Sequence, residues 1–498
     1  GVMKFISTRG GECVTGAQAI AQGIAKDGGL FVPETFPSVS EKEMEEMLAM
    51  NYAERAACVL HKFLDDYDFD GLKAACEKAY SKFDEGDAAP LVKIDDSLYM
   101  LELFHGPTCA FKDLALTLLP YLLREGCNLC GIKEQVLILV ATSGDTGKAA
   151  LEGFKDAEGV KIMVFYPSDG VSKMQKLQMA TQEGKNVNVL AVRGNFDECQ
   201  SAVKKIFTSE ECKEDLKGKG VVLSSANSIN FGRLAPQIAY YFSAYLDLVS
   251  SEQIKMGDPV DFAVPTGNFG NILAAYYAKR MGLPVGKLIC ASNKNNVLTD
   301  FIRTGKYDKR REFFKTMSPS MDILISSNLE RLLFELSGRE PKRIKLRMDK
   351  LASDGVYEIY DEEREELSKL FWADFCGEDE TVETIYEFFE EYQYPMDTHT
   401  ACAMYAAANY MAGEETKDGN PMVVVSTASP YKFPQDVMYA VTGNDIKDSF
   451  KAIKHLNIAT AMKVPASLSK LRDKPIRFKE TADKDTLYAE VLKFVDKK

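Results

Sequence analysis

Short runs of consecutive apolar residues alternate with longer amphipathic runs through the middle of the chain. The apolar runs are VLILVA (136–141), KIMVFYP (161–167), VNVLAV (187–192), GVVLSSA (220–226) and DFAVPT (261–266), and a helical pattern follows each of them. These units recur at very roughly thirty residues, which is the usual length of a βα unit. Such near-continuous apolar strands predict a parallel sheet with helices on both faces, an α/β fold.

The rest of the chain predicts further domains, because 498 residues are too many for one small core. Residues 1–90 carry short helical patterns, with Ser40 placed to cap one of them, and predict a small helical domain. A last strand in MVVVSTASPYKF (422–433) places hydroxyl residues at its carboxyl end, where open α/β sheets bind ligands. We expect an N-terminal domain at 1–90, a large domain at 91–127 and 257–498, and a smaller α/β domain at 128–256.

Composition limits the classes of function. The formal net charge of -13 and the pI near 5.1 argue against a nucleic-acid surface and against docking on an anionic membrane. The eleven cysteines are scattered through apolar patterns, as reduced cysteines are in cytosolic proteins, and with only four histidines we expect no metal site. The first ten residues, GVMKFISTRG, have no run long enough for a signal peptide or a spanning helix, so we expect a cytoplasmic protein.

One lysine stands in an unusual place. In FHGPTCAFKD (104–113), Lys112 lies between an aromatic ring and Asp113, where a Gly-Pro turn gives way to an apolar helical run. Asp113 is placed to cap a helix that runs through LALTLLPYLLREG, with a kink at Pro120 and an end at Gly126. A partly desolvated lysine has a lowered pKa and can attack a carbonyl, although a lysine that only caps or snorkels remains the alternative.

Two loops between a strand and a helix are rich in small and polar residues, TSGDTGK (142–148) and TGNFGN (266–271). The backbone N–H groups of such loops bind anions, although a tight turn that needs glycine explains either loop equally well. The first loop fails as a nucleotide-phosphate motif, because Thr142 replaces its first glycine and Ala149 its magnesium-binding hydroxyl. Placed on the same sheet edge as Lys112, these loops favour pyridoxal phosphate, with the lysine bound covalently and the glycine loop on the 5′-phosphate.

Several of these motifs occur together in one order. The segment STRGGECVTGAQAIAQGIAKDGGLFVPE is followed by FHGPTCAFKD, ATSGDTGKAA, NSINFGR, PTGNFGN, PSMDI and STASPYKF. In this the chain closely resembles the threonine synthase family of the fungal and bacterial type, among the fold-type II pyridoxal-phosphate enzymes. The resemblance extends from about Lys4 to Phe433 and leaves the last sixty-odd residues without a recognised motif. It implies a tryptophan synthase β-like fold, with parallel sheets flanked by helices.

The resemblance also implies roles for particular residues. The cofactor would be carried by Lys112, its phosphate held by Gly267, Asn268, Phe269, Gly270 and Asn271, and its pyridine nitrogen bonded by Thr427, or by Ser426 if the register is off by one. The substrate's carboxylate and the ring face would meet Ser143, Asp145 and Thr146, and its phosphate Lys148, Asn227 and Arg233. A surface ion pair remains the alternative for Arg233.

The family's reaction converts O-phosphohomoserine and water to threonine and phosphate by γ-elimination and β-addition. Lys112 would then shuttle the proton at Cα. A related phospholyase that releases phosphate, ammonia and a 2-oxo acid is the first alternative, and a non-catalytic binding relative is the second. We expect the small-molecule substrate to be the only partner of a monomeric protein, with a dimer left open.

Overall fold

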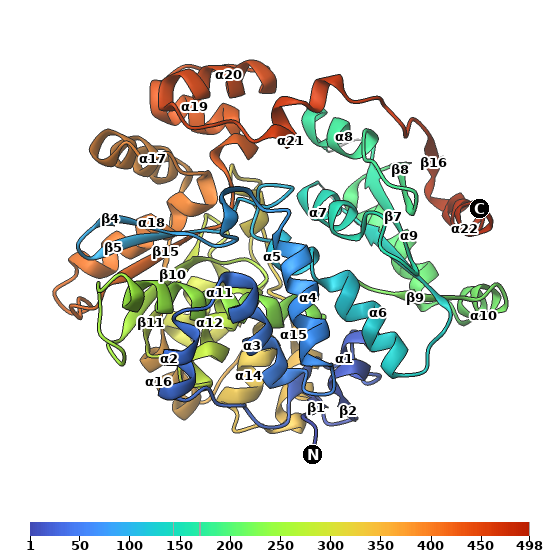
Figure 1. The fold of residues 1–498 in the computed structure, drawn as a ribbon, viewed down its shortest axis with the longest axis horizontal. Coiled ribbons are helices and arrows are strands. Elements are labelled where there is room, and N and C mark those ends of the chain that lie inside the picture. Colours follow the sequence, from blue (N-terminus) through green and yellow to red (C-terminus); the bar gives the residue numbers. More distant parts are fainter. Residues whose placement is uncertain (143, 169–170, 498) are drawn as a thin grey trace.

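Two separate sheets form the framework of the protein. The computed structural model describes residues 1–142, 144–168 and 171–497. The six-stranded sheet has the order β14 (Phe371–Phe375), β11 (Val285–Ser292), β10 (Val260–Pro265), β15 (Met422–Ser426), β5 (Leu98–Glu102) and β4 (Leu91–Asp95). Its neighbouring strands are parallel except for the antiparallel pair of β4 and β5. The predicted α/β fold with parallel sheets is confirmed (Figure 1).

The smaller sheet has five strands, which are all parallel. Their order is β16 (Thr481–Asp483), β8 (Val187–Arg193), β7 (Val160–Pro167), β6 (Gln135–Ala141) and β9 (Val221–Ser224). With β16, the end of the chain returns to this sheet, and α22 (Leu487–Asp496) buries apolar side chains against it. The predicted division assigns residues 257–498 to the large domain, whereas residues 481–496 pack here (Figure 1). A three-residue strand has no periodicity that a sequence pattern could reveal.

Helices cover both faces of the larger sheet. On one face lie α11 (Phe231–Ser250) and α12 (Gly270–Arg280), and on the other α17 (Glu378–Tyr392), α18 (Thr398–Ala412) and α19 (Pro434–Thr442). The long helix α11 is apolar almost all round and is buried over most of its length, as such a helix must be.

The N-terminal domain contains a sheet that the sequence did not predict. It consists of β2 (Cys13–Thr15), β1 (Lys4–Ser7) and β3 (Phe31–Pro33), all antiparallel. Its helices are α1 (Gly16–Gln22), α2 (Glu41–Met47), α3 (Tyr52–Phe63) and α4 (Phe69–Tyr80). Ser40 caps α2 as predicted, and four helices make up most of the domain. The three strands were not predicted, because strands of three and four residues are too short to show alternation.

The helix predicted after Lys112 is two helices, α5 (Asp113–Leu116) and α6 (Leu119–Leu129). Pro120 lies in the first turn of α6, where its missing N–H costs nothing, and so it starts a helix and does not kink one. Gly126 lies inside α6 and does not end it. A Cβ there would lie 2.7 Å from the Tyr67 hydroxyl, so Gly126 serves close packing.

The other helices and strands lie around the two larger sheets or connect their strands. They are α7 (Asp145–Phe154), α8 (Lys173–Ala180), α9 (Phe196–Thr208), α10 (Glu210–Gly218), α13 (Val297–Thr304), β12 (Lys306–Asp308), α14 (Leu329–Leu336), α15 (Pro341–Asp354), β13 (Val356–Glu358), α16 (Asp361–Leu370), α20 (Ser449–Thr460) and α21 (Ala466–Ser469), with 3-10 turns η1 (Asp84–Gly86), η2 (Pro319–Met321), η3 (Pro430–Lys432), η4 (Leu471–Asp473) and η5 (Lys484–Thr486). Within the described ranges, no helix is both long enough and apolar enough to span a bilayer.

Candidate active site

The segment that carries Lys112 is held by the last strand of the larger sheet. The Phe111 N–H donates to the Thr427 carbonyl at 2.8 Å, just beyond the carboxyl end of β15. Asp113 does not cap the helix with its side chain; its carboxylate accepts hydrogen bonds from the N–H and the hydroxyl of Thr108, at 2.8 and 2.6 Å. Burial raises the pKa of Asp113 to about 6. The two predicted positions, Lys112 and Thr427, are therefore brought together.

The amine of Lys112 contacts the TSGDTG loop (142–147). Its Nζ donates to the Thr146 hydroxyl at 2.7 Å. Burial lowers the pKa of Lys112 to about 8, with a further decrease from Arg233 and Lys432 that Asp145 opposes. A lysine with this pKa has an appreciable neutral fraction near pH 7, as a nucleophilic amine requires.

The TSGDTG loop leads from β6 into α7. The Thr142 hydroxyl accepts hydrogen bonds from the N–H groups of Gly144 and Gly147, which shape the turn, whereas the predicted Ser143 lies outside the described residues. Asp145 forms an ion pair with Lys432, with Nζ and Oδ1 3.3 Å apart. Burial alone would raise the pKa of Asp145, but the charges of Lys432 and Lys112 lower it below its usual value. This carboxylate is therefore ionised and has a counter-ion in the protein.

The TGNFGN loop leads from β10 into α12. Phe269 has a left-handed backbone with φ of 70° at the start of α12. The N–H groups of Gly270, Asn271 and Ile272 have no intrahelical acceptor because they lie in the first turn, and such groups bind phosphates. Asn268 is exposed. Its carbonyl accepts a hydrogen bond from the Asn328 N–H at 2.8 Å, which holds the loop from outside.

The side chain of Asn271 is oriented by two tyrosines. Its Oδ1 accepts hydrogen bonds from the hydroxyls of Tyr240 and Tyr241, each at 2.6 Å. Its Nδ2 is buried without a hydrogen-bond partner among the described residues. An amide held in this way presents a donor, which suits an anion.

The TSGDTG loop follows β6 of the five-stranded sheet, and the TGNFGN loop follows β10 of the six-stranded sheet. The sequence suggested that both loops lie on one sheet edge, and this was wrong. Lys112 lies where the sheets meet, because its segment bonds to the end of β15 and its amine to the loop after β6. The candidate site is thus built between the two sheets.

The three residues predicted to bind the substrate's phosphate differ in their surroundings. The Arg233 guanidinium is buried in the first turn of α11, where Nη1 donates to the Ala226 carbonyl at 2.8 Å and Nε has no partner within the described ranges. It is not in a surface ion pair, and burial lowers its pKa to about 10. The Lys148 amine contacts the Glu152 carboxylate at 3.3 Å and donates to Gln182 at 2.6 Å. Asn227 is exposed.

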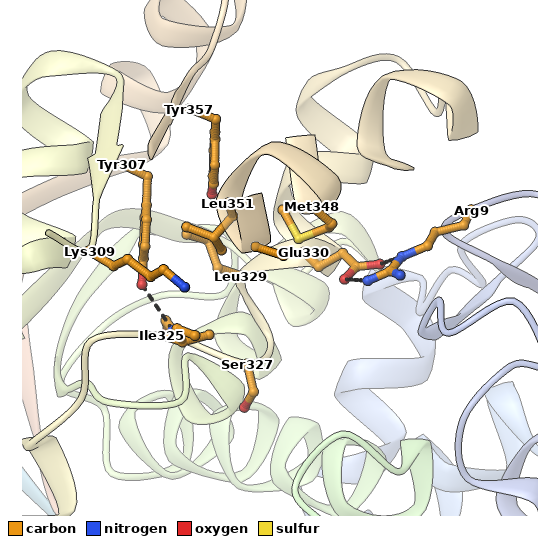
Figure 2. Close-up of a pocket in the computed structure, with 12 residues that line it drawn as sticks. Arg9, Tyr307, Lys309, Ile325, Ser327, Leu329, Glu330, Met348, Leu351 and Tyr357 are labelled. Carbon is orange, nitrogen blue, oxygen red and sulfur yellow. Dashed lines mark hydrogen bonds and ion pairs between the residues drawn. The ribbon is translucent and has the colours of Figure 1, made fainter. Parts of the chain in front are cut away.

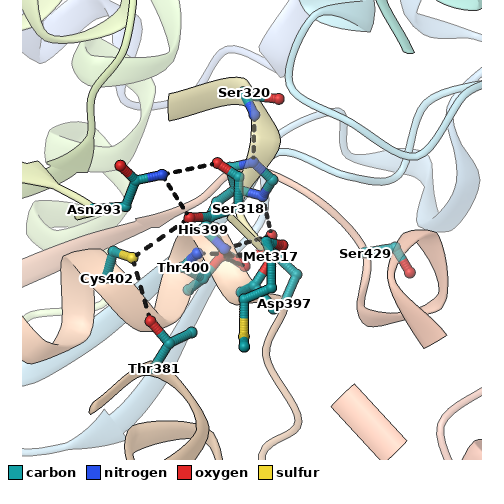
Figure 3. Close-up of polar contacts among 12 residues, drawn as sticks. Asn293, Met317, Ser318, Ser320, Thr381, Asp397, His399, Thr400, Cys402 and Ser429 are labelled. Atoms are coloured by element: carbon teal, nitrogen blue, oxygen red, sulfur yellow. Dashed lines mark hydrogen bonds and ion pairs between the residues drawn. The ribbon is translucent and has the colours of Figure 1, made fainter. Parts of the chain in front are cut away.

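Sequence reasoning missed a polar network around His399, at the start of α18 (Figure 3). The buried Asp397 carboxylate lies 2.8 Å from Nδ1 of His399, and Nε2 accepts the Ser320 N–H at 3.1 Å. Because a backbone N–H can only donate, the ring is neutral with its proton on Nδ1. Ser320 belongs to η2, and the carbonyl oxygen of Ser320 packs against Gly267. The only signal in the sequence was the motif PSMDI, which includes Ser320.

A cavity of about 280 Å³ lies away from Lys112, between the N-terminal domain and α14 and α15 (Figure 2). Its lining includes Tyr307, Lys309 and Met348, together with an ion pair between Arg9 and Glu330 at 3.0 Å. No titratable residue of the candidate site lines it. We therefore assign the chemistry to the surroundings of Lys112 and not to this cavity.

Buried donors without partners identify what the site would hold. Within the described part of the chain, Arg233 Nε, Lys432 Nζ and Asn271 Nδ2 are buried and make no hydrogen bond. All three atoms are donors and two carry positive charge. Asp145 balances the charge of Lys432 in part, but within the described ranges no carboxylate pairs with Arg233. A buried cation without a counter-ion is costly, so the arrangement fits anionic groups such as the phosphate of pyridoxal phosphate.

Comparisons with known proteins agree with this geometry. Family models match three parts of the chain: "Threonine synthase N terminus" at residues 4–80, "Pyridoxal-phosphate dependent enzyme" at 87–428 and "Threonine synthase, C-terminal" at 400–495. The last match includes the region in which the sequence showed no recognised motif.

Similar proteins and solved structures point the same way. A threonine synthase of Pseudomonas aeruginosa is 40% identical over 89% of this chain and 91% of its own length. The human protein named threonine synthase-like 1 is 41% identical over 87% of this chain, which spans 59% of that protein's length. The crystal structure of a PLP-bound threonine synthase from Brucella melitensis has a TM-score of 0.89 at 35% identity, over 99% of this chain and 100% of that one. The chain belongs to the threonine synthase family of pyridoxal-phosphate-dependent enzymes.

Proposed function

We propose that this protein is a threonine synthase, which converts O-phospho-L-homoserine and water to L-threonine and phosphate. The observation that carries the proposal is a set of buried donors, on Arg233, Lys432 and Asn271, that have no partner within the described ranges. The charges of Arg233 and Lys432 act on the Lys112 amine. The cofactor contributes one phosphate, and this substrate brings a second phosphate and a carboxylate. A site with several spare donors suits such a ligand better than a neutral amino acid.

Lys112 is the residue to which we assign covalent attachment of pyridoxal phosphate. Its partly buried amine and its pKa of about 8 support this role. For the cofactor's phosphate we assign Gly267, Asn268, Phe269, Gly270 and Asn271, supported by the free N–H groups at the start of α12. Thr427 would bond the pyridine nitrogen, and when bound the cofactor supplies an electron sink for the substrate's carbon atoms.

The same lysine is the natural carrier of the proton at the substrate's Cα. A base is most effective when its pKa lies near the working pH, and a lysine near 8 can both accept and return a proton. The Thr146 hydroxyl, 2.7 Å from Nζ, would orient the amine. Removal of this hydroxyl should therefore slow proton transfer without removing the amine.

For the substrate's anionic groups we favour Arg233 over Lys148. Among the described residues Arg233 Nε has no partner, whereas the Lys148 amine is already bound by Glu152 and Gln182. Thr146 and Asp145 border the same space, and Asp145 is balanced by Lys432, so a carboxylate near an anionic substrate is no longer an obstacle. Asn227 and Ser143 stay predictions from the family resemblance.

The second candidate is a phospholyase that releases phosphate, ammonia and a 2-oxo acid from the same substrate. It is favoured by the similarity to threonine synthase-like 1, which matches this chain as closely as the threonine synthases do. The two activities share the cofactor and the loss of phosphate and differ in what happens afterwards at Cβ.

A product assay separates the two candidates. The holoenzyme is incubated with O-phosphohomoserine, and phosphate, threonine, ammonia and 2-oxo acid are each quantified, with Lys112→Ala as the control. Threonine and phosphate in equal amounts would support threonine synthase. Ammonia and a 2-oxo acid would support the phospholyase, and no product from the cofactor-loaded protein would rule out both.

A further inference from the structure

A second buried lysine lies beside the candidate cofactor lysine and has no assigned role. Lys432 ends η3, which follows the carboxyl end of β15 in the STASPYKF segment. Its side chain is 3% exposed, and its nearest carboxylate is that of Asp145, 3.3 Å from Nζ. The contact with Asp145 is an ion pair, and within the described ranges the Lys432 amine has no hydrogen-bond partner. A primary ammonium has three N–H groups, so at least two of them have no acceptor among the described residues.

The balance of charge around the site is positive. The charges that act on the Lys112 amine are those of Asp145, Arg233, Lys432 and Asp113. Asp113 is a second carboxylate near this amine, bonded by the N–H and the hydroxyl of Thr108, and with a pKa raised by burial to about 6 it is still largely ionised near pH 7. Two carboxylates, Asp145 and Asp113, therefore face three basic side chains, Lys112, Arg233 and Lys432. The remaining excess of buried positive charge favours binding of an anion.

We propose that Lys432 is an anion-binding residue of this site: it pairs with Asp145 and presents its remaining N–H donors to a phosphate or carboxylate group of the bound ligands. The inference rests on the proposed function in that the substrate is a phosphorylated amino acid. The group that binds Lys432 is an oxyanion, and it can belong to the cofactor or to the substrate.

Lys148 provides an internal comparison. Both lysines are largely buried and both have an acidic neighbour, but the Lys148 amine also donates to Gln182 at 2.6 Å. Within the part of the chain that the structure describes, the Lys148 amine donates to protein acceptors, whereas the Lys432 amine has no hydrogen-bond acceptor. A residue that served only to stabilise the fold would be expected to resemble Lys148.

The test compares K432M with wild type and with K447M, an exposed lysine paired with Asp445. For each protein, one titration measures the affinity of the apoprotein for pyridoxal phosphate and for pyridoxal, which lacks the phosphate. Another measures inhibition of the holoenzyme by inorganic phosphate, together with KM and kcat for O-phosphohomoserine. Melting temperatures report whether each variant is folded.

K432M should weaken anion binding on the order of 10- to 100-fold, the usual cost of losing a hydrogen bond from a charged donor. If the anion is the cofactor's phosphate, the affinity for pyridoxal phosphate falls and that for pyridoxal does not. If it belongs to the substrate, the inhibition constant of phosphate and KM rise while cofactor affinity stays unchanged. Unchanged values for both anions in a folded K432M protein would overturn the proposal.

K432Q carries the test if K432M does not fold, because glutamine keeps a donor and loses the charge. Failure of both variants to fold would assign Lys432 to stability and also overturn the proposal. The proposed function fails separately: a wild-type protein that binds phosphate through Lys432 but makes no threonine overturns only that function.

Discussion

Replacing Gly267 by alanine tests how closely η2 packs on the candidate cofactor loop. An ideal Cβ at Gly267 would lie 2.4 Å from the Ser320 carbonyl oxygen and 3.4 Å from Met321 Cα. An ordinary contact is about 1 Å longer than the first distance. The neighbour is main chain and cannot rotate away, because the Ser320 N–H is bound by His399 and the Met321 N–H by the Ser318 carbonyl. Either the loop or η2 must therefore move.

The expected cost follows from this geometry. Forcing an extra methyl group into a packed site costs about 1–3 kcal/mol, which corresponds to roughly a 5- to 150-fold loss of affinity if the loop takes up the strain. We expect the Gly267→Ala apoprotein to bind pyridoxal phosphate more weakly by that factor. An absorbance titration of the apoprotein measures the affinity, and thermal unfolding reports how much of the strain lowers stability instead.

Two other glycines serve as controls. A Cβ at Gly270, in the same loop, would lie 3.4 Å from a side-chain nitrogen of Asn328, so Gly270→Ala should change affinity less than about threefold. A Cβ at Gly218, in α10, would meet no atom within 4 Å, so Gly218→Ala should change neither affinity nor stability. A Gly267→Ala protein that matches Gly218→Ala in both measurements would refute the reasoning.

Two further predictions concern groups around the same loop. The neutral amine of Lys112 is the reactive form and burial lowers its pKa to about 8, so the reaction of the apoprotein with pyridoxal should accelerate with rising pH and reach half its maximum near pH 8. Stopped-flow absorbance from pH 6 to 10 measures this, and a midpoint near the ordinary lysine value would contradict it. His399→Asn should leave the Ser320 N–H without its acceptor, at a cost of about 1–3 kcal/mol. Urea unfolding measures that loss and a cofactor titration its effect on the loop; no change in either would show that η2 is held by other contacts.

Local patterns were enough to predict much of the architecture. The five strands expected between residues 136 and 266 all exist, and Ser40 caps α2 as expected. These features depend on neighbouring residues, through the run of apolar positions in a buried strand and the side-chain oxygen of a cap. The order of the motifs was also sufficient to recognise the family.

Strand pairing was decided only in three dimensions. β14 and β11 lie at one edge of the larger sheet, β4 at the other, and none of them was predicted. The placement of β16 beside β8 joins the end of the chain to a sheet formed mostly before residue 225. The local pattern does not show which distant strand a strand will pair with. The hydrogen bonds between strands are made by backbone groups, which are the same for nearly every type of side chain.

The site divides in the same way. The amino-acid sequence by itself determined that Lys112 sits at a turn before a helix and that two glycine-containing loops follow apolar strands. Only the tertiary structure decided that these loops come from different sheets, that Lys432 is the counter-ion of Asp145, and that His399 holds η2 against Gly267. The physical reason is that a pKa, an ion pair or an unpartnered donor depends on groups brought together by folding, and their distance along the chain does not predict it.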